Sequence, residues 1–326
     1  MTPLLRVKDL GVQFKVRGGR RLQAVRGLSF EIAPRETVAL VGESGSGKST
    51  AARAVLRLVK SSSGTVEING QEITTMRPRE LARFRRHAQM VFQDPYSSLD
   101  PSMTIAESLA EPLRFHTELT RGERRSRAEE LLEQVGLRRE HADRYPHEFS
   151  GGQRQRIAIA RAIALNPSLL VADEAVSALD VSSQNQILLL LKRLSDELGI
   201  GCLFISHDLA VVRNLADRIL VMYLGHIVEE GPTQSVFESP RHPYTAALLS
   251  AALVADPKRQ AERRRVQLTG ELPDPTNPPK GCVFSTRCPQ AQAICHQEAP
   301  VSRSTAVGGS VACHFELTPS NGKREA

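Results

Sequence analysis

The sequence contains no tryptophan, and aromatic residues make up only 4% of its 326 residues. Proteins that hold single-stranded nucleic acid stack its bases on aromatic side chains interleaved with basic ones. That platform is missing here, although lysine and arginine together number 43 against 36 for aspartate and glutamate. The positive excess suits phosphate-bearing ligands or a membrane surface equally well. We therefore expect no nucleic-acid partner.

Long apolar runs are also missing. The stretches Ile187–Leu191 and Ile219–Leu224 stop far short of the roughly 20 residues that a transmembrane helix needs. The first residues, MTPLLRVKDLGVQF, mix charged with apolar residues and lack the continuous apolar core of a secretory signal. We therefore expect a cytosolic protein that does not cross a membrane by itself.

Cysteine is scarce outside one C-terminal segment. Cys202 stands alone in an apolar stretch, where a cysteine usually serves as a core residue. The other four lie close together in the sequence: Cys282, Cys288, Cys295 and Cys313. In a reducing cytosol such clustering favours a metal centre over disulfides. The spacing lacks the C-x2-C pairs usual for structural zinc, and a [4Fe–4S] cluster accepts thiolates from irregular loops. We expect the cluster, with zinc as runner-up, aided by His296 or His314, and free thiols as the remaining alternative.

A glycine-rich loop lies between a predicted strand, Thr37–Val41, and a predicted helix that begins at Lys48. The loop sequence GESGSGKS fits the P-loop pattern, whose backbone N–H groups wrap phosphates while its lysine neutralises them and its serine holds Mg²⁺. A ligand-free turn is the alternative, and the flanking strand and helix make it the weaker one. The residues predicted to bind ATP here are Gly42, Ser44, Gly45, Ser46, Gly47, Lys48, Ser49 and Thr50.

Two further apolar runs, Ser168–Ala172 and Gly201–Ile205, predict buried strands. With helical pattern between them, they indicate an α/β fold with a mostly parallel sheet, whose strand ends meet at one edge. Asp173 and Glu174 follow the first run. We expect Asp173 to bind Mg²⁺ and Glu174 to orient or deprotonate the attacking water. Such a pair often caps a helix instead, but the upstream P-loop favours catalysis.

The composition divides the chain into two expected domains, residues 1–240 and 241–326. Within the first, a charged segment with helical periodicity from about 94 to 165 predicts a helical subdomain. The second opens with a short helix at His242-Pro243-Tyr244, continues through a proline-rich connector and ends in a polar tail, 318–326, expected to be disordered.

Ser150-Gly151-Gly152-Gln153, followed by Arg154-Gln155-Arg156, resembles the signature sequence of ATP-binding-cassette (ABC) proteins. In family order, Gln93 resembles the Q-loop glutamine, Ser177–Asp180 the D-loop, and His207 the switch histidine. Singly, Gln93 could be a surface amide and His207 a strand-end histidine. Their co-occurrence in order favours the cassette.

The resemblance implies a shared ATP site: the signature of one cassette closes over ATP held by the P-loop of another. Ser150, Gly151, Gly152 and Gln153 would then contact the partner's ATP, and Asp180 would link the two sites. Gln93 would complete the Mg²⁺ shell and signal to the helical subdomain. Two positions depart from the family pattern, Ala175 after the catalytic glutamate and Phe149 before the signature, and neither removes a reacting group. Phe14 is the candidate to stack on adenine, with a buried strand residue as the alternative.

Gln93–Pro101 and His242–Thr245, followed by the four cysteines, resemble the ATPases of dipeptide/oligopeptide importers, and Tyr96 and Asp100 resemble the second of their two paired subunits. This implies a paralogous ATPase, two permease subunits and an extracytoplasmic binding protein, assembled at the inner membrane with this chain on the cytoplasmic face. Related systems carry nickel or glutathione, so the cargo stays open. The resemblance also favours the [4Fe–4S] cluster, which we expect to be structural or redox-sensing and remote from ATP chemistry.

Two rivals remain. Cassette ATPases that act on DNA or ribosomes need long coiled coils or two cassettes, and neither feature is present. A non-enzymatic nucleotide-binding module would be marked most simply by loss of Glu174 or His207, and both are retained.

Overall fold

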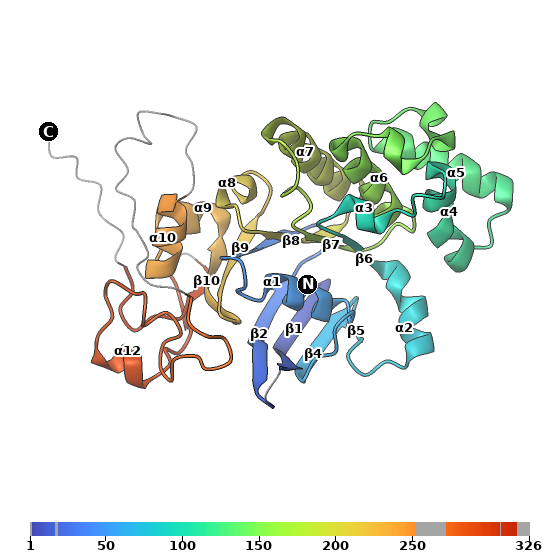
Figure 1. Ribbon diagram of the computed structural model, residues 1–326. Coiled ribbons are helices and arrows are strands. Elements are labelled where there is room, and N and C mark those ends of the chain that lie inside the picture. The colour runs from blue at the N-terminus through green and yellow to red at the C-terminus, as the bar shows by residue number, and fades with distance from the viewer. Residues whose placement is uncertain (1, 17–18, 252–271, 307, 318–326) are drawn as a thin grey trace, which may run out of the picture.

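The protein is described by a computed structural model that covers residues 2–16, 19–251, 272–306 and 308–317 (Figure 1). Its centre is an eight-stranded sheet. Five neighbouring strands, β6, β7, β8, β3 and β9, run parallel to one another. Strands β10, β12 and β11 extend the sheet with antiparallel pairing. In spatial order they are β6 (Ala88–Val91), β7 (Leu169–Asp173), β8 (Gly201–Ser206), β3 (Thr37–Val41), β9 (Arg218–Tyr223), β10 (His226–Pro232), β12 (Ser310–Val311) and β11 (Arg303–Ser304). The expected α/β fold with a mostly parallel core sheet is confirmed.

A second, four-stranded antiparallel sheet covers one face of the main sheet together with helix α1 (Lys48–Val55). Strand β3 alternates its side chains between two cores: Val38 and Leu40 face the antiparallel sheet, whereas Ala39 and Val41 face the helices. This follows from the two-residue period of a strand. The sequence had not predicted the antiparallel sheet. Its strands, in spatial order, are β2 (Arg21–Ile32), β1 (Leu5–Lys15), β4 (Ser63–Ile68) and β5 (Gln71–Glu72).

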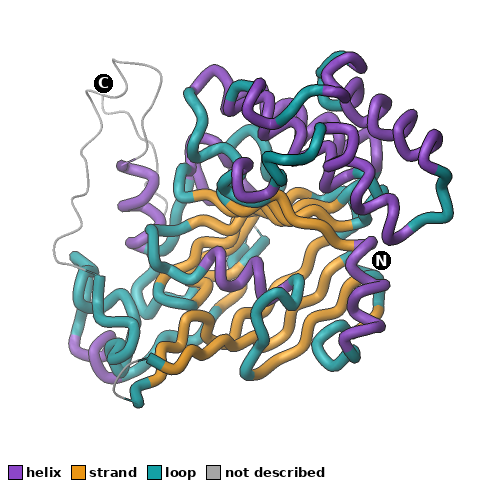
Figure 2. The backbone as a smooth tube through the Cα atoms, turned by 45° about the vertical axis from the view of Figure 1, so that its right-hand side comes forward, coloured by secondary structure: helices purple, strands orange, loops and turns teal. Residues whose placement is uncertain are grey.

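Helices cover the opposite face of the main sheet, as Figures 1 and 2 show. The segment between β6 and β7 contains no strand among its described residues, which confirms the helical subdomain. Capping boxes at Thr104 and Thr120 begin two of its helices, because each threonine and the glutamate three residues later satisfy free N–H groups at the helix start. The elements are α3 (Pro95–Ser98), α4 (Ile105–His116), α5 (Arg121–Gln134), two short 3₁₀ turns (Arg139–Asp143 and Pro146–Glu148) and α6 (Gly151–Ile163).

The remaining helices connect strands or belong to the C-terminal extension. The helix after the D-loop is α7 (Val181–Leu198), which ends at Gly199 in the left-handed conformation that glycine adopts without strain. The others are α2 (Pro78–Phe84), a 3₁₀ turn (Arg85–His87), α8 (Leu209–Val212), α9 (Thr233–Glu238), α10 (Pro243–Ala251) and α12 (Ala293–Gln297). In the described part of the chain no helix is long and apolar enough to span a bilayer. The predicted disordered tail lies outside the described residues.

The C-terminal extension is the name we use for residues 241–326, and its described residues, 241–251, 272–306 and 308–317, pack directly on the cassette. Its strand β12 pairs with β10 at the end of the main sheet, and its orange and red elements lie beside β9 and β10 in Figure 1. Tyr244 and Phe284 of the extension join the same buried core as Tyr223 of β9. These contacts place the extension close to the loops at the sheet edge.

Candidate nucleotide site

The P-loop leaves the carboxyl end of β3 and, at two of its glycines, approaches neighbouring backbone too closely for a side chain. A Cβ on Gly42 would lie 2.2 Å from the carbonyl oxygen of Met222, and one on Gly47 would lie 2.2 Å from that of Ala24. Gly47 also has φ 103°, which favours glycine. The loop therefore curls tightly around the start of α1.

Lys48 is buried, with 4% of its surface exposed, and its ammonium donates to the carbonyl oxygens of Gly42 and Glu43, each at 2.9 Å. Burial lowers the pKa of Lys48, although the nearby carboxylates of Glu174, Asp173 and Glu43 oppose that shift. A buried ammonium folded back on its own loop is a preformed site for phosphate oxygens.

Ser49 and Asp173 meet at the start of α1. The Ser49 hydroxyl donates to Asp173 Oδ1 at 2.7 Å, and an Arg53 nitrogen lies 3.7 Å from Oδ2. Burial raises the pKa of Asp173, against the hydrogen bond from Ser49. A hydroxyl and a carboxylate side by side are the hard oxygen ligands that Mg²⁺ takes alongside phosphate oxygens. These residues fit a magnesium ion held with a nucleotide.

Glu174 follows β7 with φ 48°, a left-handed conformation that costs free energy in residues other than glycine and gathers at functional sites. Its Oε2 accepts a hydrogen bond from Gln93 Nε2 at 3.1 Å and lies 3.4 Å from Nδ1 of His207. Gln93 follows β6 and His207 follows β8, so three adjacent parallel strands bring these side chains together. The carboxylate is placed to accept a proton from a water molecule.

Lys48, Ser49, Gln93 and Glu174 line one hollow of about 490 Å³, whereas Asp173 and His207 contact its lining residues Ser49 and Glu174 from behind. Phe14, 38% exposed, lines the same hollow as the P-loop residues, and its stacking on adenine stays a prediction. Five lining residues had no signal in the sequence: Leu22, Gln23, Ala24, Leu224 and Pro275. Leu22, Gln23, Ala24 and Leu224 lie near the P-loop in the structure but outside the motif in the sequence. Pro275 belongs to the proline-rich connector.

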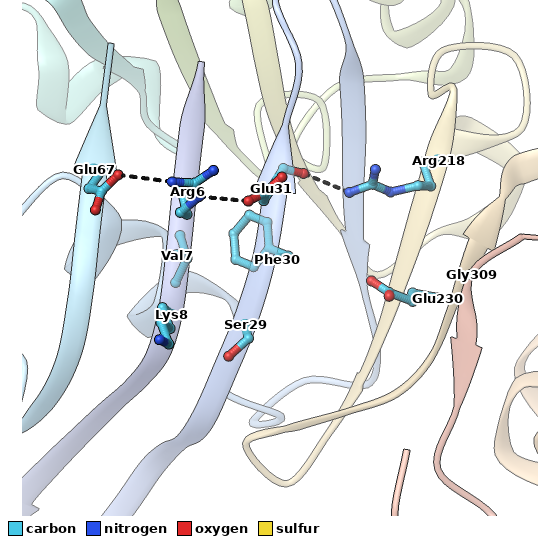
Figure 3. Close-up of a pocket in the computed structure, with 10 residues that line it drawn as sticks. All are labelled: Arg6, Val7, Lys8, Ser29, Phe30, Glu31, Glu67, Arg218, Glu230 and Gly309. Carbon is cyan, nitrogen blue, oxygen red and sulfur yellow. Dashed lines mark hydrogen bonds and ion pairs between the residues drawn. The ribbon is translucent and has the colours of Figure 1, made fainter. Parts of the chain in front are cut away.

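A larger hollow, of about 800 Å³, opens elsewhere (Figure 3). Three of its charged side chains pair with one another: Arg6 lies between Glu31, at 2.7 Å, and Glu67, at 3.5 Å. No P-loop residue lines it. The smaller hollow is therefore the one with the chemistry of a nucleotide site.

The signature residues do not line the hollow of their own chain. Ser150 caps the start of α6 and exchanges hydrogen bonds with Gln153, and Gly151 and Gly152 form its first turn. Asp180 caps α7 by accepting from the N–H of Ser183. The two patches that the sequence predicted to serve ATP are thus separate surfaces on one chain.

Comparisons with known proteins decide the family. A model described as "ABC transporter" matches residues 25–177, and one described as "Oligopeptide/dipeptide transporter, C-terminal region" matches residues 228–295. The oligopeptide transport ATP-binding proteins AppF of Bacillus subtilis and OppF of Escherichia coli are 48% and 49% identical, over 96% and 91% of this chain and 97% and 92% of theirs. This chain belongs to the ATP-binding subunits of ABC transporters. It is an ATPase coupled to transport.

Two further relatives of this ABC ATPase add detail. The glutathione import ATP-binding protein GsiA of Escherichia coli K12 is 56% identical over 83% of this chain, which spans only 44% of GsiA. The ATP-binding cassette MJ0796, solved as a dimer with ADP and Pi, superposes with a TM-score of 0.65 at 34% identity, over 70% of this chain and 98% of MJ0796.

The cysteines of this ABC ATPase divide as the sequence suggested. Cys202 is buried in β8, and burial raises its pKa to about 12. Burial raises the pKa of Cys313 to about 11, against a hydrogen bond with the backbone of Phe315, and the thiols of Cys282, Cys288 and Cys295 add to the rise, so the four lie within one another's electrostatic reach. Yet no three His, Cys, Asp or Glu side chains in the described ranges are grouped as metal ligands. The four thiols share a neighbourhood without forming a coordination site.

The extension reaches the P-loop, a contact that the sequence had not indicated. Pro275 lines the nucleotide hollow, and Arg287, one residue before Cys288, forms an ion pair with Glu43 inside the P-loop. Sequence separation concealed the contact, because Arg287 lies 244 positions after Glu43 and neither residue belongs to the motif's reacting groups.

Proposed function

We propose that this ABC ATPase energises the import of dipeptides or oligopeptides, or of a related small solute such as glutathione. The main support is that one chain contains both a complete P-loop site and a C-terminal region, residues 228–295, that matches the oligopeptide/dipeptide transporter model. AppF and OppF, which are named for oligopeptide transport, match over nearly their whole length. GsiA, named for glutathione import, supports glutathione as the alternative cargo.

The proposed roles of the site residues follow from their positions. Lys48 and the amides of the P-loop bind the phosphates, Ser49 and Asp173 hold Mg²⁺ with Gln93 nearby, and Phe14 stacks on the adenine. When bound, Mg²⁺ neutralises charge on the phosphates. Glu174 accepts a proton from the attacking water, with His207 3.4 Å from its carboxylate to stabilise it.

We propose that the site is completed by a second cassette. Ser150, Gly151, Gly152 and Gln153 lie outside the hollow of their own chain. The capping box engages the N–H groups of Ser150 and Gln153, and those of Gly151 and Gly152 in the first turn of α6 can meet the γ-phosphate held by a partner. Asp180, the last residue of the D-loop that would connect the two sites, caps the start of α7. The dimer of MJ0796 with ADP and Pi supports this arrangement. The partner cassette is expected to be a paralogue.

The permeases need a docking surface, and a hollow of about 730 Å³ between α2 and the end of α4 suits that role. Phe115 is 72% exposed there, with the guanidinium of Arg114 5.8 Å from its ring centre. Basic side chains outnumber acidic ones around it: Arg83, Arg86, His87, Arg114 and His116 against Glu80 and Glu118. We propose that it receives an acidic, partly apolar cytoplasmic segment of a permease, which would hold the chain at the cytoplasmic face of the inner membrane. An extracytoplasmic binding protein would deliver the cargo.

We further propose that the four C-terminal cysteines hold a [4Fe–4S] cluster, with zinc as the alternative, within a C-terminal domain of residues 241–326 that follows a cassette of residues 1–240. The donor set and the shared neighbourhood of the thiols support it. Because the side chains are not grouped as ligands in the described residues, the loops would close on the metal as it binds. Iron, sulfide and zinc analysis of protein purified without oxygen tests this. Iron-free, folded protein with four alkylatable thiols would exclude the cluster.

The cargo is tested on the assembled transporter. We expect its ATPase rate to rise several-fold when the binding protein is loaded with a mixture of di- to pentapeptides, and not with nickel. Stimulation by glutathione alone would move the assignment to the second cargo. No stimulation by peptides or glutathione, with ATPase activity intact, would contradict the proposed import.

A further inference from the structure

The C-terminal extension holds one residue of the P-loop from two sides. Glu43 is the second residue of that loop, and its carboxylate receives both terminal nitrogens of Arg287, at 2.7 and 3.1 Å. Its backbone N–H donates to the Tyr244 hydroxyl at 2.9 Å. Both partners belong to the extension, which the nucleotide motifs do not include.

Glu43 also sets the position of the phosphate-binding groups. Its carbonyl oxygen accepts from the Lys48 ammonium at 2.9 Å and from the N–H of Ser46 at 3.2 Å. Every hydrogen-bonding group of Glu43 is therefore engaged, outward to the extension or inward to the loop. A displacement of Glu43 would move the acceptor of Lys48 directly.

We call the two residues that hold Glu43, Arg287 and Tyr244, the clamp. The clamp is rigid because both residues pack in a buried aromatic cluster. The Arg287 side chain is only 8% exposed, and its guanidinium lies 5.9 Å from the ring centre of Tyr223. Tyr223, Tyr244 and Phe284 are fully buried and meet at centroid distances of 4.7 to 5.4 Å. Such packing fixes both clamp residues before any ligand arrives.

Arg287 also compensates the negative charge of Glu43. An acidic side chain in a loop that wraps phosphates would repel them if its charge were left free, more strongly where water is excluded. A planar guanidinium paired with both carboxylate oxygens compensates that charge and fixes its direction. A contact that served only to attach the extension to the cassette would not need to involve a P-loop residue.

We propose that Arg287 and Tyr244 are positioning residues for ATP, which hold Glu43 so that the P-loop keeps its phosphate-binding shape. The inference rests on the proposed role of the P-loop. It makes the extension part of the nucleotide site, whether or not the cysteines carry a metal.

The test compares Arg287→Met with Arg241→Met in the assembled transporter. Arg241 is a matched control, because it also forms an ion pair inside the extension, with Glu316 at 3.2 Å, and has no contact with the P-loop among those described. We expect Arg287→Met to raise the KM for ATP about tenfold with kcat within about twofold, corresponding to about 1.4 kcal/mol. Arg241→Met should leave the KM within twofold of the wild type.

Gentler variants keep the test valid if Arg287→Met does not fold. Tyr244→Phe removes only the hydroxyl and should raise the KM about threefold, and Arg287→Lys should recover part of the loss. In a Glu43→Gln background, Arg287→Met should change the KM by less than twofold, because the charge it compensates is gone.

Equal KM values for folded wild type, Arg287→Met and Tyr244→Phe would overturn the inference. So would equal rises in Arg287→Met and Arg241→Met. If the wild-type transporter itself neither binds nor hydrolyses ATP, the ATPase assignment fails instead, so the two failures are distinguishable.

Discussion

At the scale of single residues, the strained Glu174 is the centre of the chemistry. Its positive φ aims a carboxylate at the point where Gln93 and His207 converge. A left-handed conformation in a residue other than glycine persists only when the surrounding structure determines it. The sequence identified all three residues by motif order, but their mutual contact follows from the parallel strand order β6, β7, β8.

We expect Glu174→Gln to lower the ATPase rate of the assembled transporter at least about 100-fold, because the amide cannot accept a proton from water. The affinity for ATP should stay within about threefold, since the contacts of Lys48 and Ser49 are unchanged. Turnover and equilibrium binding of ATP measure the two quantities. Near-normal turnover, with the partner's own site disabled, would remove Glu174 from the base role.

At the scale of elements, the parallel strands were predictable and the antiparallel sheet was not. Strands β3, β7 and β8 are continuous apolar runs buried on both faces, which gives a strong local signal. Strands β1 and β2 mix exposed and buried positions and contain register shifts, which blur the two-residue period. Pro275 and Arg287 reach the site through tertiary packing, which no local pattern reveals.

Phe115, at the end of α4, lies in the proposed docking hollow for the permeases. Phe115→Ala should weaken assembly with the permeases at least about tenfold, because an exposed aromatic in a docking hollow acts as an anchor. ATP binding by the subunit itself should not change. Val301→Ala, at a 75% exposed position of the extension, serves as a control. Co-purification with the permeases measures assembly, and equal retention of Phe115→Ala and the control would exclude this surface.

At the scale of the whole molecule, stability should depend on pH through buried neutral histidines. Burial lowers the pKa of His242 to about 3 and that of His226 to about 4. The unfolded chain takes up protons on these imidazoles near pH 6.5, whereas the fold does not, so stability is full above that value and falls as pH decreases. The slope is about 1.4 kcal/mol per pH unit for each histidine between pH 6.5 and 4.

Glu229, which accepts the N–H of His242, works in the opposite direction, because burial raises its pKa. The comparison is therefore made with His242→Asn, whose amide oxygen can replace Nδ1 as the acceptor for the N–H of Tyr244. Denaturant unfolding between pH 7.5 and 5 should show a shallower pH dependence in the variant. Identical slopes would contradict a neutral, buried His242.

The whole account requires that two chains share each ATP and that hydrolysis drives transport. Reconstituted vesicles with this subunit, its paralogue, the permeases and the binding protein test both at once. We predict ATP-dependent accumulation of a labelled tripeptide, lost in Glu174→Gln and in Ser150→Arg, whereas the isolated subunit hydrolyses ATP slowly. Fast hydrolysis by a proven monomer, or accumulation that persists in either variant, would contradict the account.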